Sequence, residues 1–389
     1  MKIKILGAGI GGLSTAIALR KNGFNVEVYE RHECRSDIGA GIVCWPNASF
    51  VLDQLGLLSD IAKHSGLPTR MNRRSSEGEE LGMLNLLDLN EKMGYSSFSI
   101  LRLDLMRVLE SHAKKLGVEI KYGNRIEKLV SSKAGYTGIF LDNGNIEHAD
   151  AIIGADGRMS SVTREFVKGE NTPVYQGFIN WIGVYKSRNP IFHDIQVTDY
   201  WGVGKRFGIV PVSSTIAYWA GGVSSSTLDE KDPQNYQSDL LSLFRNWPSP
   251  IETLIRETHL ANINKLYVHD HNPMERWHKD NALVIGDAAH AALPTSGQGA
   301  CQALEDAWHL ANLFKKYEDD LESIYNKFTE HRFSKTTGIT MGARQLASSL
   351  FNTDPGYCVQ RNKKSIGTDY EAVVSGMATG WSSGLPIGV

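Results

Sequence analysis

Three glycines near the start of the chain have the spacing of a phosphate-binding turn. They are Gly7, Gly9 and Gly12, within residues 5–12 (ILGAGIGG). The first glycine permits a tight turn, the second lets a phosphate approach the backbone, and the third lets helix and strand pack closely. A helix that starts here directs N–H groups and the positive end of its dipole at a pyrophosphate. The spacing therefore predicts a dinucleotide site, although a single motif of this kind also occurs in ordinary tight turns.

The residues around the glycines favour the dinucleotide interpretation. Residues 2–6 form an apolar run, residues 10–23 have helical apolar spacing, and residues 25–30 alternate as in a strand. A strand, helix and strand of about 30 residues can form a right-handed parallel crossover. Glu30 ends the second strand, where a carboxylate can accept hydrogen bonds from an adenosine ribose. Arg31 follows it as a further cofactor-binding candidate.

Two later stretches each place an aspartate beyond a glycine at the end of an apolar run. In residues 152–164 the aspartate is Asp156, followed by Gly157; in residues 282–307 it is Asp287, preceded by Gly286. An aspartate there can bond a ribitol or ribose hydroxyl at the carboxyl edge of a sheet, where ligands of parallel sheets bind. Each stretch alone could equally be a turn or a helix cap.

In this order and spacing, the three motifs resemble those of flavoprotein monooxygenases of the para-hydroxybenzoate hydroxylase type, over residues 2 to about 345. The resemblance implies noncovalent FAD. It implies that the three glycines and Glu30 hold the ADP half, and that Asp287 bonds the ribityl chain. It further implies roles near the flavin for Arg102, Asp156, Gly157, Gly286, Pro294, Gly297 and Gly299. Arg102 could instead be a surface charge at a helix start, and His290 is interpreted as a structural group that bonds the backbone near the flavin loop.

The resemblance also implies a reaction. FAD accepts a hydride from NADPH or NADH, and a flavin C4a-hydroperoxide then transfers one oxygen atom from O2 to a small aromatic or heteroaromatic substrate. No metal or side-chain nucleophile is required. The alternatives are an epoxidase or another FAD oxidoreductase of the same fold, and a catalytically inert FAD-binding protein. A flavin disulfide reductase is disfavoured, because the sequence has neither a CxxxxC motif nor a second GxGxxG.

Two polar residues in the later aromatic-rich segments are the candidates for substrate contact. Arg206 and Tyr218 fall on neighbouring predicted strands, RFGIVPV and TIAYWAGG. These strands resemble those of the urate-hydroxylase and epoxidase-like branches, in which an arginine and a tyrosine have substrate roles. A cross-strand arginine packed on an aromatic ring would explain the pair as well. Ile182 stands where many relatives that act on benzoates carry an arginine, which disfavours a salicylate-type substrate.

The predicted fold is α/β, with a Rossmann-like FAD-binding domain interleaved with an antiparallel-sheet substrate domain and followed by C-terminal helices. Helices are expected at residues 103–116 and after the flavin loop, and a hairpin around Asp142-Asn143-Gly144. Residues 362–389, which are polar and then Gly/Ser-rich, are expected to be loosely held or packed on the surface. The expected boundaries are 1–68, 100–171 and 275–350 for the FAD-binding domain, 69–99 and 172–274 for the substrate domain, and 351–389 for the C-terminal segment.

The composition bounds these interpretations. The chain has 389 residues, 41% of them hydrophobic, and its 41 basic and 43 acidic residues leave a formal charge of -2. This balance gives no electrostatic reason to expect a nucleic-acid or membrane partner. Four scattered cysteines, at 34, 44, 301 and 358, indicate reduced thiols rather than zinc ligands or disulfides. We expect a soluble, cytoplasmic monomer or homodimer, with no signal peptide and no membrane-spanning run.

Overall fold

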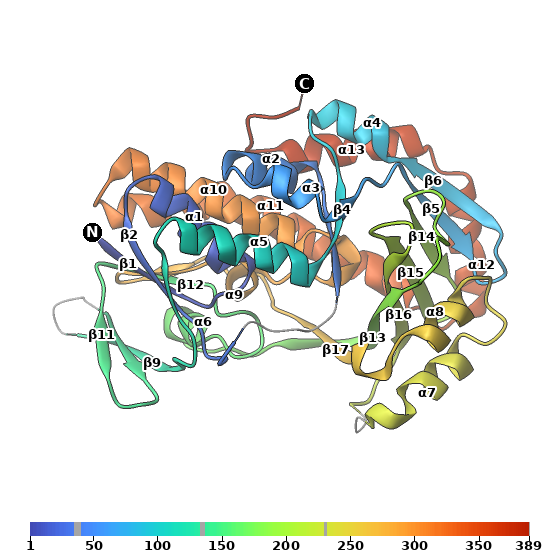
Figure 1. The fold of residues 1–389 in the computed structure, drawn as a ribbon, viewed down its shortest axis with the longest axis horizontal. Helices are drawn as coiled ribbons and strands as arrows, with labels where there is room; N and C mark the ends of the chain where they lie inside the picture. Colours follow the sequence, from blue (N-terminus) through green and yellow to red (C-terminus); the bar gives the residue numbers. More distant parts are fainter. Residues whose placement is uncertain (35–39, 133–136, 229–231, 389) are drawn as a thin grey trace.

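Two large β-sheets organise the protein. The computed structural model describes residues 1–34, 40–132, 137–228 and 232–388. One sheet has six strands and the other has seven, and long helices run beside the first of them (Figure 1). The predicted α/β fold with a second, largely antiparallel sheet and C-terminal helices is confirmed.

The six-stranded sheet is built around β1 (Lys2–Leu6), whose Ile3 and Ile5 are fully buried. This strand pairs in parallel with β2 (Asn25–Tyr29) on one side and with β12 (Ala151–Gly154) on the other. The carboxyl ends of these three strands therefore meet at one edge, where ligands of parallel sheets bind. The remaining strands are β8 (Glu119–Lys121), β19 (Ala282–Val284) and the antiparallel edge strand β18 (His278–Lys279).

Helices with one apolar face cover this sheet. The helix α1 (Ile10–Lys21) follows β1 directly and packs against α5 (Arg102–Lys115) and α10 (Gly299–Tyr317). The 30-residue helix α11 (Leu321–Leu350) packs against α10 in turn. All three helices predicted from the sequence, over residues 10–23, over 103–116 and after the flavin loop, are thus present. Shorter helices are α2 (Pro46–Gln54), α3 (Leu58–Ala62), α4 (Leu86–Met93), α6 (Val162–Lys168), α7 (Tyr236–Leu243), α8 (Ile251–Glu257) and α9 (Asp287–His290).

Two three-stranded sheets flank the large ones. The first joins β9 (Ile126–Ser131), β10 (Thr137–Leu141) and β11 (Ile146–His148), and the last two form the hairpin predicted at Asp142-Asn143-Gly144. The first strand of this hairpin is described from Thr137 on, because residues 133–136 lie outside the described part. The second sheet joins β3 (Gly41–Cys44), β7 (Phe98–Leu101) and β4 (Ser65–Gly66).

The seven-stranded sheet departs in one respect from the antiparallel sheet expected. Its order is β17-β13-β16-β15-β14-β5-β6, and the pair β14–β5 is parallel. The chain enters β5 from β4 of a neighbouring short sheet. As a result, β5 runs in the same direction as β14 and pairs with it in parallel. The bounds are β5 (Arg70–Ser75), β6 (Glu80–Asn85), β13 (Val174–Lys186), β14 (Gln196–Trp201), β15 (Lys205–Pro211), β16 (Ile216–Ser224) and β17 (Ile263–Asp270).

The two faces of the seven-stranded sheet have different partners. One face carries Trp181, Phe207 and Trp219, which form a core with α7 and α8. Because side chains alternate along a strand, Arg206, Gly208 and Val210 of β15 point to the opposite face. There Val210 joins the same core as the FAD-side helices. This opposite face is called the inner face below.

The C-terminal segment is packed rather than loosely held. Its helices α12 (Pro355–Ile366) and α13 (Tyr370–Ser382) lie against β6, and α13 also lies against α4 (Figure 1). Val374 and Cys358 are buried in these contacts. None of the helices in the described ranges combines the length and the apolar character that a membrane span requires.

Candidate functional site

A cleft of about 660 Å³ opens at the carboxyl edge of β1, β2 and β12. It is lined by residues from each motif of the N-terminal half of the chain. Both Gly7 and Gly9 of the glycine turn line it, as do Glu30 and Arg102. The same wall includes three more predicted residues, Arg31, Asp156 and Gly157, and their neighbour Ser160. The motifs that the sequence separates by more than a hundred residues are therefore brought together.

The three glycines of the turn meet different surroundings. Gly7 has φ +108°, and a Cβ there would lie 2.3 Å from the Ala155 carbonyl oxygen. A Cβ on Gly12 would lie 1.9 Å from the Gly7 carbonyl oxygen, so this glycine is needed for helix α1 to pack against the turn. A Cβ on Gly9 would meet nothing within 4 Å. Gly9 caps α1 without a side-chain hydrogen bond, which leaves the helix N-terminus open for an anion.

Glu30 holds the turn against the second strand. Its Oε2 accepts a hydrogen bond from the Ala8 N–H at 2.9 Å, and its Oε1 accepts one from the His32 N–H at 3.0 Å. Each carboxylate oxygen has a further lone pair for a ribose hydroxyl. Arg31 extends across the rim and donates to the Ser160 hydroxyl.

Arg102 is the first residue of α5, and its guanidinium lines the cleft. Its backbone N–H donates to the Ala40 carbonyl, while its side chain has no hydrogen-bond partner within the described ranges. Burial lowers the pKa of Arg102, and the carboxylates of Asp287 and Glu30 act against that shift. A guanidinium with no such partner can donate hydrogen bonds to a phosphate or a flavin oxygen.

Asp156 lines the cleft and is half-buried, but its carboxylate bonds its own chain. Oδ1 accepts from the Ser161 hydroxyl at 2.5 Å, and Oδ2 accepts from the Thr163 backbone at 3.0 Å and its hydroxyl at 3.1 Å. Burial raises the pKa of Asp156, and these hydrogen bonds act against the shift. The side chain therefore shapes the loop that carries Gly157, whose φ is +79°.

Asp287 stands at the start of α9, after Gly286 in a backbone conformation with φ +56°. Its Oδ2 forms an ion pair with Arg158 Nη1 at 3.0 Å. Sequence reasoning missed Arg158, although it directly follows the Asp156-Gly157 pair. The two aspartate motifs are thus joined by a side-chain contact that only the fold reveals.

The loop from Pro294 to Gly299 is held from two sides. The Trp45 indole N–H donates to the Gly297 carbonyl at 3.0 Å, and the Thr295 hydroxyl donates to Ala343 of α11 at 3.0 Å. A Cβ on Gly299, the first residue of α10, would lie 4.0 Å from Asp287 Oδ1. The N-terminus of α10 and Asp287 therefore face the same space.

A buried ionic network lies behind this loop. Asp306 Oδ2 accepts from the Gly286 N–H at 2.7 Å and contacts His290 Nε2 at 2.6 Å, while Oδ1 accepts from Arg332 at 2.7 Å. Burial raises the pKa of Asp306, but His290 and Arg332 outweigh it and lower the pKa to about 2. The interpretation of His290 as a backbone-bonding group is corrected, since its partner is a carboxylate. The network fixes the backbone that carries Asp287.

Arg206 and Tyr218 share the inner face of the seven-stranded sheet. Tyr218 pairs in register with Val210, and Arg206 pairs with Gly222. The Arg206 Nε donates to Asp199 Oδ1 at 2.6 Å, and among the described residues no aromatic ring stacks on Arg206. Burial raises the pKa of Tyr218, and the thiols of Cys44 and Cys301 add to the shift while Arg206 opposes it. The phenol is therefore neutral and can donate a hydrogen bond.

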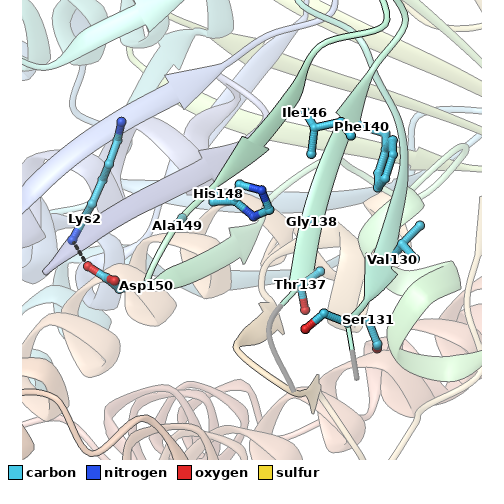
Figure 2. A pocket seen from close by; sticks show the side chains of 11 residues that line it. Lys2, Val130, Ser131, Thr137, Gly138, Phe140, Ile146, His148, Ala149 and Asp150 are labelled. Carbon is cyan, nitrogen blue, oxygen red and sulfur yellow. Dashed lines mark hydrogen bonds between the residues drawn. The ribbon is translucent and has the colours of Figure 1, made fainter. Parts of the chain in front are cut away.

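A second cleft, of about 610 Å³, lies apart from all these residues. It is formed on the three-stranded sheet β9–β10–β11 beside Lys2 and Asp150, as Figure 2 shows. Its wall is mostly apolar, with Val130, Phe140 and Ile146 exposed toward it. None of the predicted site residues contributes to it, so the motif-lined cleft is the candidate site.

The motif-lined cleft fits the nucleotide half of FAD. The open position at Gly9, the uncapped N-terminus of α1 and the Arg102 guanidinium, which has no hydrogen-bond partner among the described residues, together offer steric room, N–H donors and a positive charge. Glu30 supplies acceptors at the end of β2. Within the described residues no cluster of metal-ligating side chains is found.

Comparison with known proteins agrees with this geometry. The family described as "FAD binding domain" matches residues 1–324. An FAD-dependent urate hydroxylase of Mycolicibacterium vanbaalenii is 32% identical over 91% of this chain and 90% of its own length. A 3-amino-4-hydroxybenzoate 2-monooxygenase of Streptomyces cremeus is 29% identical over 99% and 96%. The crystal structure of Klebsiella pneumoniae HpxO complexed with FAD and uric acid matches with a TM-score of 0.90 and 28% identity, over 99% of this chain and 97% of that one.

Proposed function

We propose, from the premise that this chain belongs to the FAD-dependent aromatic-ring monooxygenase family, that it hydroxylates a heteroaromatic ring bearing carbonyl or hydroxyl oxygens. Members of this family use NAD(P)H and O2 and act on aromatic or heteroaromatic substrates. Bound FAD supplies hydride acceptance and oxygen activation. The protein supplies position, electrostatics and exclusion of water.

The observation that carries the proposal is the pair of free donors on the inner face. Tyr218 has a neutral hydroxyl without a hydrogen-bond partner in the described part of the chain. Arg206 uses its Nε for Asp199, and both of its Nη atoms are without a partner there. Between them lie Gly208 and Ala220, which face each other in register and present almost no side chain. A planar ring can lie over such a surface with its oxygens toward the two donors.

Each residue has a distinct task in this proposal. Arg206 binds a ring oxygen through its Nη edge, since a guanidinium is a planar fork of donors. Tyr218 donates to a second ring oxygen or nitrogen, and its raised pKa keeps the proton on the phenol. Together they fix the plane of the substrate ring. This positioning matters because misplacement by about 1 Å can cost roughly a hundredfold in rate.

The choice of a heteroaromatic ring over a benzoate rests on a neighbouring position. Ile182 lies on the same face, in register with Ala220, and adds no positive charge. Arg206 is already paired with a carboxylate, so a substrate carboxylate would meet a compensated cation. The urate hydroxylases among the relatives support a purine-like ring, and the hydroxybenzoate monooxygenase is the competing precedent.

The test is NAD(P)H oxidation by the FAD-loaded protein with and without uric acid, other oxopurines, quinolones and hydroxybenzoates. We expect one oxygenated heterocycle to stimulate NAD(P)H oxidation and to be hydroxylated, with little hydrogen peroxide formed. A yellow protein that oxidises NAD(P)H with none of these rings would support the inert FAD-binding alternative. Oxygen transfer to an isolated alkene would support the epoxidase alternative.

A further inference from the structure

Arg206 is held by a chain of contacts that reaches the C-terminal segment. Asp199 is 3% exposed, and both of its carboxylate oxygens are occupied. Oδ1 accepts from Arg206 Nε at 2.6 Å, and Oδ2 accepts from the Trp201 indole N–H at 2.7 Å. Because the bond to Nε fixes one edge of a planar guanidinium, it also fixes the direction of the two Nη atoms.

The direction of the guanidinium follows from its neighbours. A Cβ on Gly208 would lie 3.6 Å from Arg206 Nη2 and 3.8 Å from Asp199 Oδ1, so the ion pair lies beside Gly208. Gly208 is one step along the inner face toward Val210, the register partner of Tyr218. The Nη edge is thus turned toward the Tyr218 end of the face.

Trp201 is held in turn by two other guanidinium groups. Arg73 of β5 and Arg361 of α12 lie over its ring, at 5.2 and 5.5 Å from the centroid. Arg361 also donates to the Gly202 carbonyl at 3.2 Å, and Arg73 donates to the Tyr370 hydroxyl at 3.3 Å. The C-terminal segment therefore supports the indole that donates to Asp199.

Asp199 is the carboxylate close to three arginines: Arg206, which it pairs with, and Arg73 and Arg361, which lie over its neighbour Trp201. Within the described ranges, neither Arg73 nor Arg361 forms an ion pair, and Arg206 pairs with Asp199 alone. Removing the charge of Asp199 would leave three guanidinium groups near the inner face without a carboxylate. An aromatic carboxylate would then gain attraction that the native site denies it.

We propose that Asp199 and Trp201 are positioning residues for substrate recognition: they fix the Nη edge of Arg206 toward Tyr218, and Asp199 makes the site prefer oxygenated rings without a carboxylate. This inference rests on the proposed function, because Arg206 is taken as the substrate-binding group. It adds Asp199 and Trp201 to the substrate site, together with a preference for rings without a carboxylate, and the sequence motifs indicated neither.

The experiment compares Asp199→Asn, which keeps the shape and removes the charge, with Trp201→Phe, which removes the indole N–H and leaves a smaller ring beneath Arg73 and Arg361. The matched control is Asp270→Asn, because Asp270 is also buried in this sheet and ion-paired, with Arg344 at 2.7 Å, but is remote from Arg206. For each FAD-loaded variant, the dissociation constants of uric acid and 3-amino-4-hydroxybenzoate are measured by perturbation of the flavin absorbance. KM, kcat and product formed per NAD(P)H are measured with the same two probes.

We expect Asp199→Asn to weaken uric acid binding about tenfold or more and to shift the preference toward the benzoate, with FAD occupancy unchanged. Trp201→Phe should lower coupling without shifting that preference. We expect Asp270→Asn to change neither the preference between the two probes nor the coupling, beyond any loss of thermal stability. A wild-type protein that binds the benzoate as tightly as uric acid would overturn the selectivity, as would equal preferences in Asp199→Asn and Asp270→Asn.

A readout without substrate separates this inference from the proposed function. In protein labelled with 15N-arginine, the Nε–H of Arg206 should give a signal protected from exchange, identified by its absence in Arg206→Gln. We expect Asp199→Asn to abolish the protection and Asp270→Asn to retain it. If the protection survives in Asp199→Asn, the positioning role is wrong, whether or not any ring stimulates the enzyme. If no ring stimulates the wild type while the protection is lost as expected, the proposed function alone has failed.

Discussion

The ring of Tyr218 lies directly against the backbone of Gly41. A Cβ built on Gly41 would lie 1.6 Å from Tyr218 Cδ1, so no side chain fits between them. Gly41 begins β3, and the preceding Ala40 carbonyl accepts from the N–H of Arg102. Tyr218, a candidate substrate residue, and Arg102, a candidate flavin residue, are therefore connected through Gly41 and Ala40.

Gly41→Ala tests this contact. The new methyl group would overlap the Tyr218 ring, so the ring must move. We expect weaker substrate binding and lower coupling than in the wild type, with FAD retained, measured by flavin absorbance titration and by product formed per NAD(P)H. The control is Gly338→Ala, at an exposed position within α11 where a Cβ meets nothing within 4 Å. Normal binding of substrate in Gly41→Ala would show that the position of the ring is unimportant.

Gly9→Val tests the phosphate site separately from the fold. A Cβ on Gly9 meets no protein atom within 4 Å, whereas a Cβ on Gly12 would lie 1.9 Å from the Gly7 carbonyl oxygen. We expect Gly9→Val to be purified largely without FAD, with the thermal stability of the wild-type apoprotein. Gly12→Ala should instead lower the stability of the apoprotein itself, by about 1–3 kcal/mol. Full FAD occupancy in Gly9→Val would exclude the pyrophosphate from this turn.

Glu30, in the wall of the cleft, and Asp287, at the start of α9, should both contribute to FAD affinity. Glu30→Ala and Asp287→Ala each remove an acceptor for a ribose or ribityl hydroxyl, and a hydrogen bond to a charged group contributes about 1.5–3 kcal/mol. We expect the FAD dissociation constant to rise by about ten- to a hundredfold in each. Equilibrium dialysis against FAD measures this directly. Unchanged affinity would mean that Glu30 serves only the Ala8 and His32 amides, or that Asp287 serves only Arg158.

Most of the cofactor-site prediction depended on short sequence motifs. The glycine turn, Glu30 and the aspartate motifs each depend on a short stretch of backbone whose strand-turn-helix geometry the neighbouring residues specify. Parallel pairing of β1 with β2 and β12 then places their carboxyl ends at one edge. This is why residues as distant as Gly9 and Asp156 could be assigned to one cleft from the sequence.

Pairings between distant side chains could not be predicted in this way. Arg158 with Asp287, and Arg206 with Asp199, depend on how a loop closes or on which side of a sheet a residue faces. The parallel pair β14–β5 also escaped prediction, since register and direction at a sheet edge depend on where the chain enters. The C-terminal segment looked polar in sequence because its buried residues, such as Val374, are few and widely spaced.

His309 should make the protein less stable in acid. It is 5% exposed on α10, and burial lowers its pKa to about 3, with the charges of Arg332 and His331 adding to the shift while Asp306 opposes it. The unfolded chain binds a proton near pH 6.5, so between pH 6.5 and 3 it holds more protons than the folded protein. The free energy of unfolding must therefore fall as the pH drops through this window. We expect His309→Gln to flatten that dependence in urea titrations at pH 7 and pH 5, whereas His64→Gln, at an exposed position, should leave it unchanged. Equal slopes in the wild type and His309→Gln would contradict the buried, neutral histidine.

Arg206→Gln and Tyr218→Phe test the substrate site itself. Both residues donate hydrogen bonds to the ring in the proposed function, and neither lines the nucleotide cleft. Without them the ring should be held less firmly over the flavin, so that activated oxygen is lost as hydrogen peroxide before it reaches the substrate carbon. We expect NAD(P)H oxidation to continue in both variants while product formed per NAD(P)H falls and peroxide rises, with FAD occupancy as in the wild type. Because Gln keeps an amide NH2 group but no charge, Arg206→Lys provides the comparison: it restores the charge without the planar fork, and we expect it to recover little coupling. Wild-type coupling in both Arg206→Gln and Tyr218→Phe would make these residues packing elements of the sheet and remove the site proposed here.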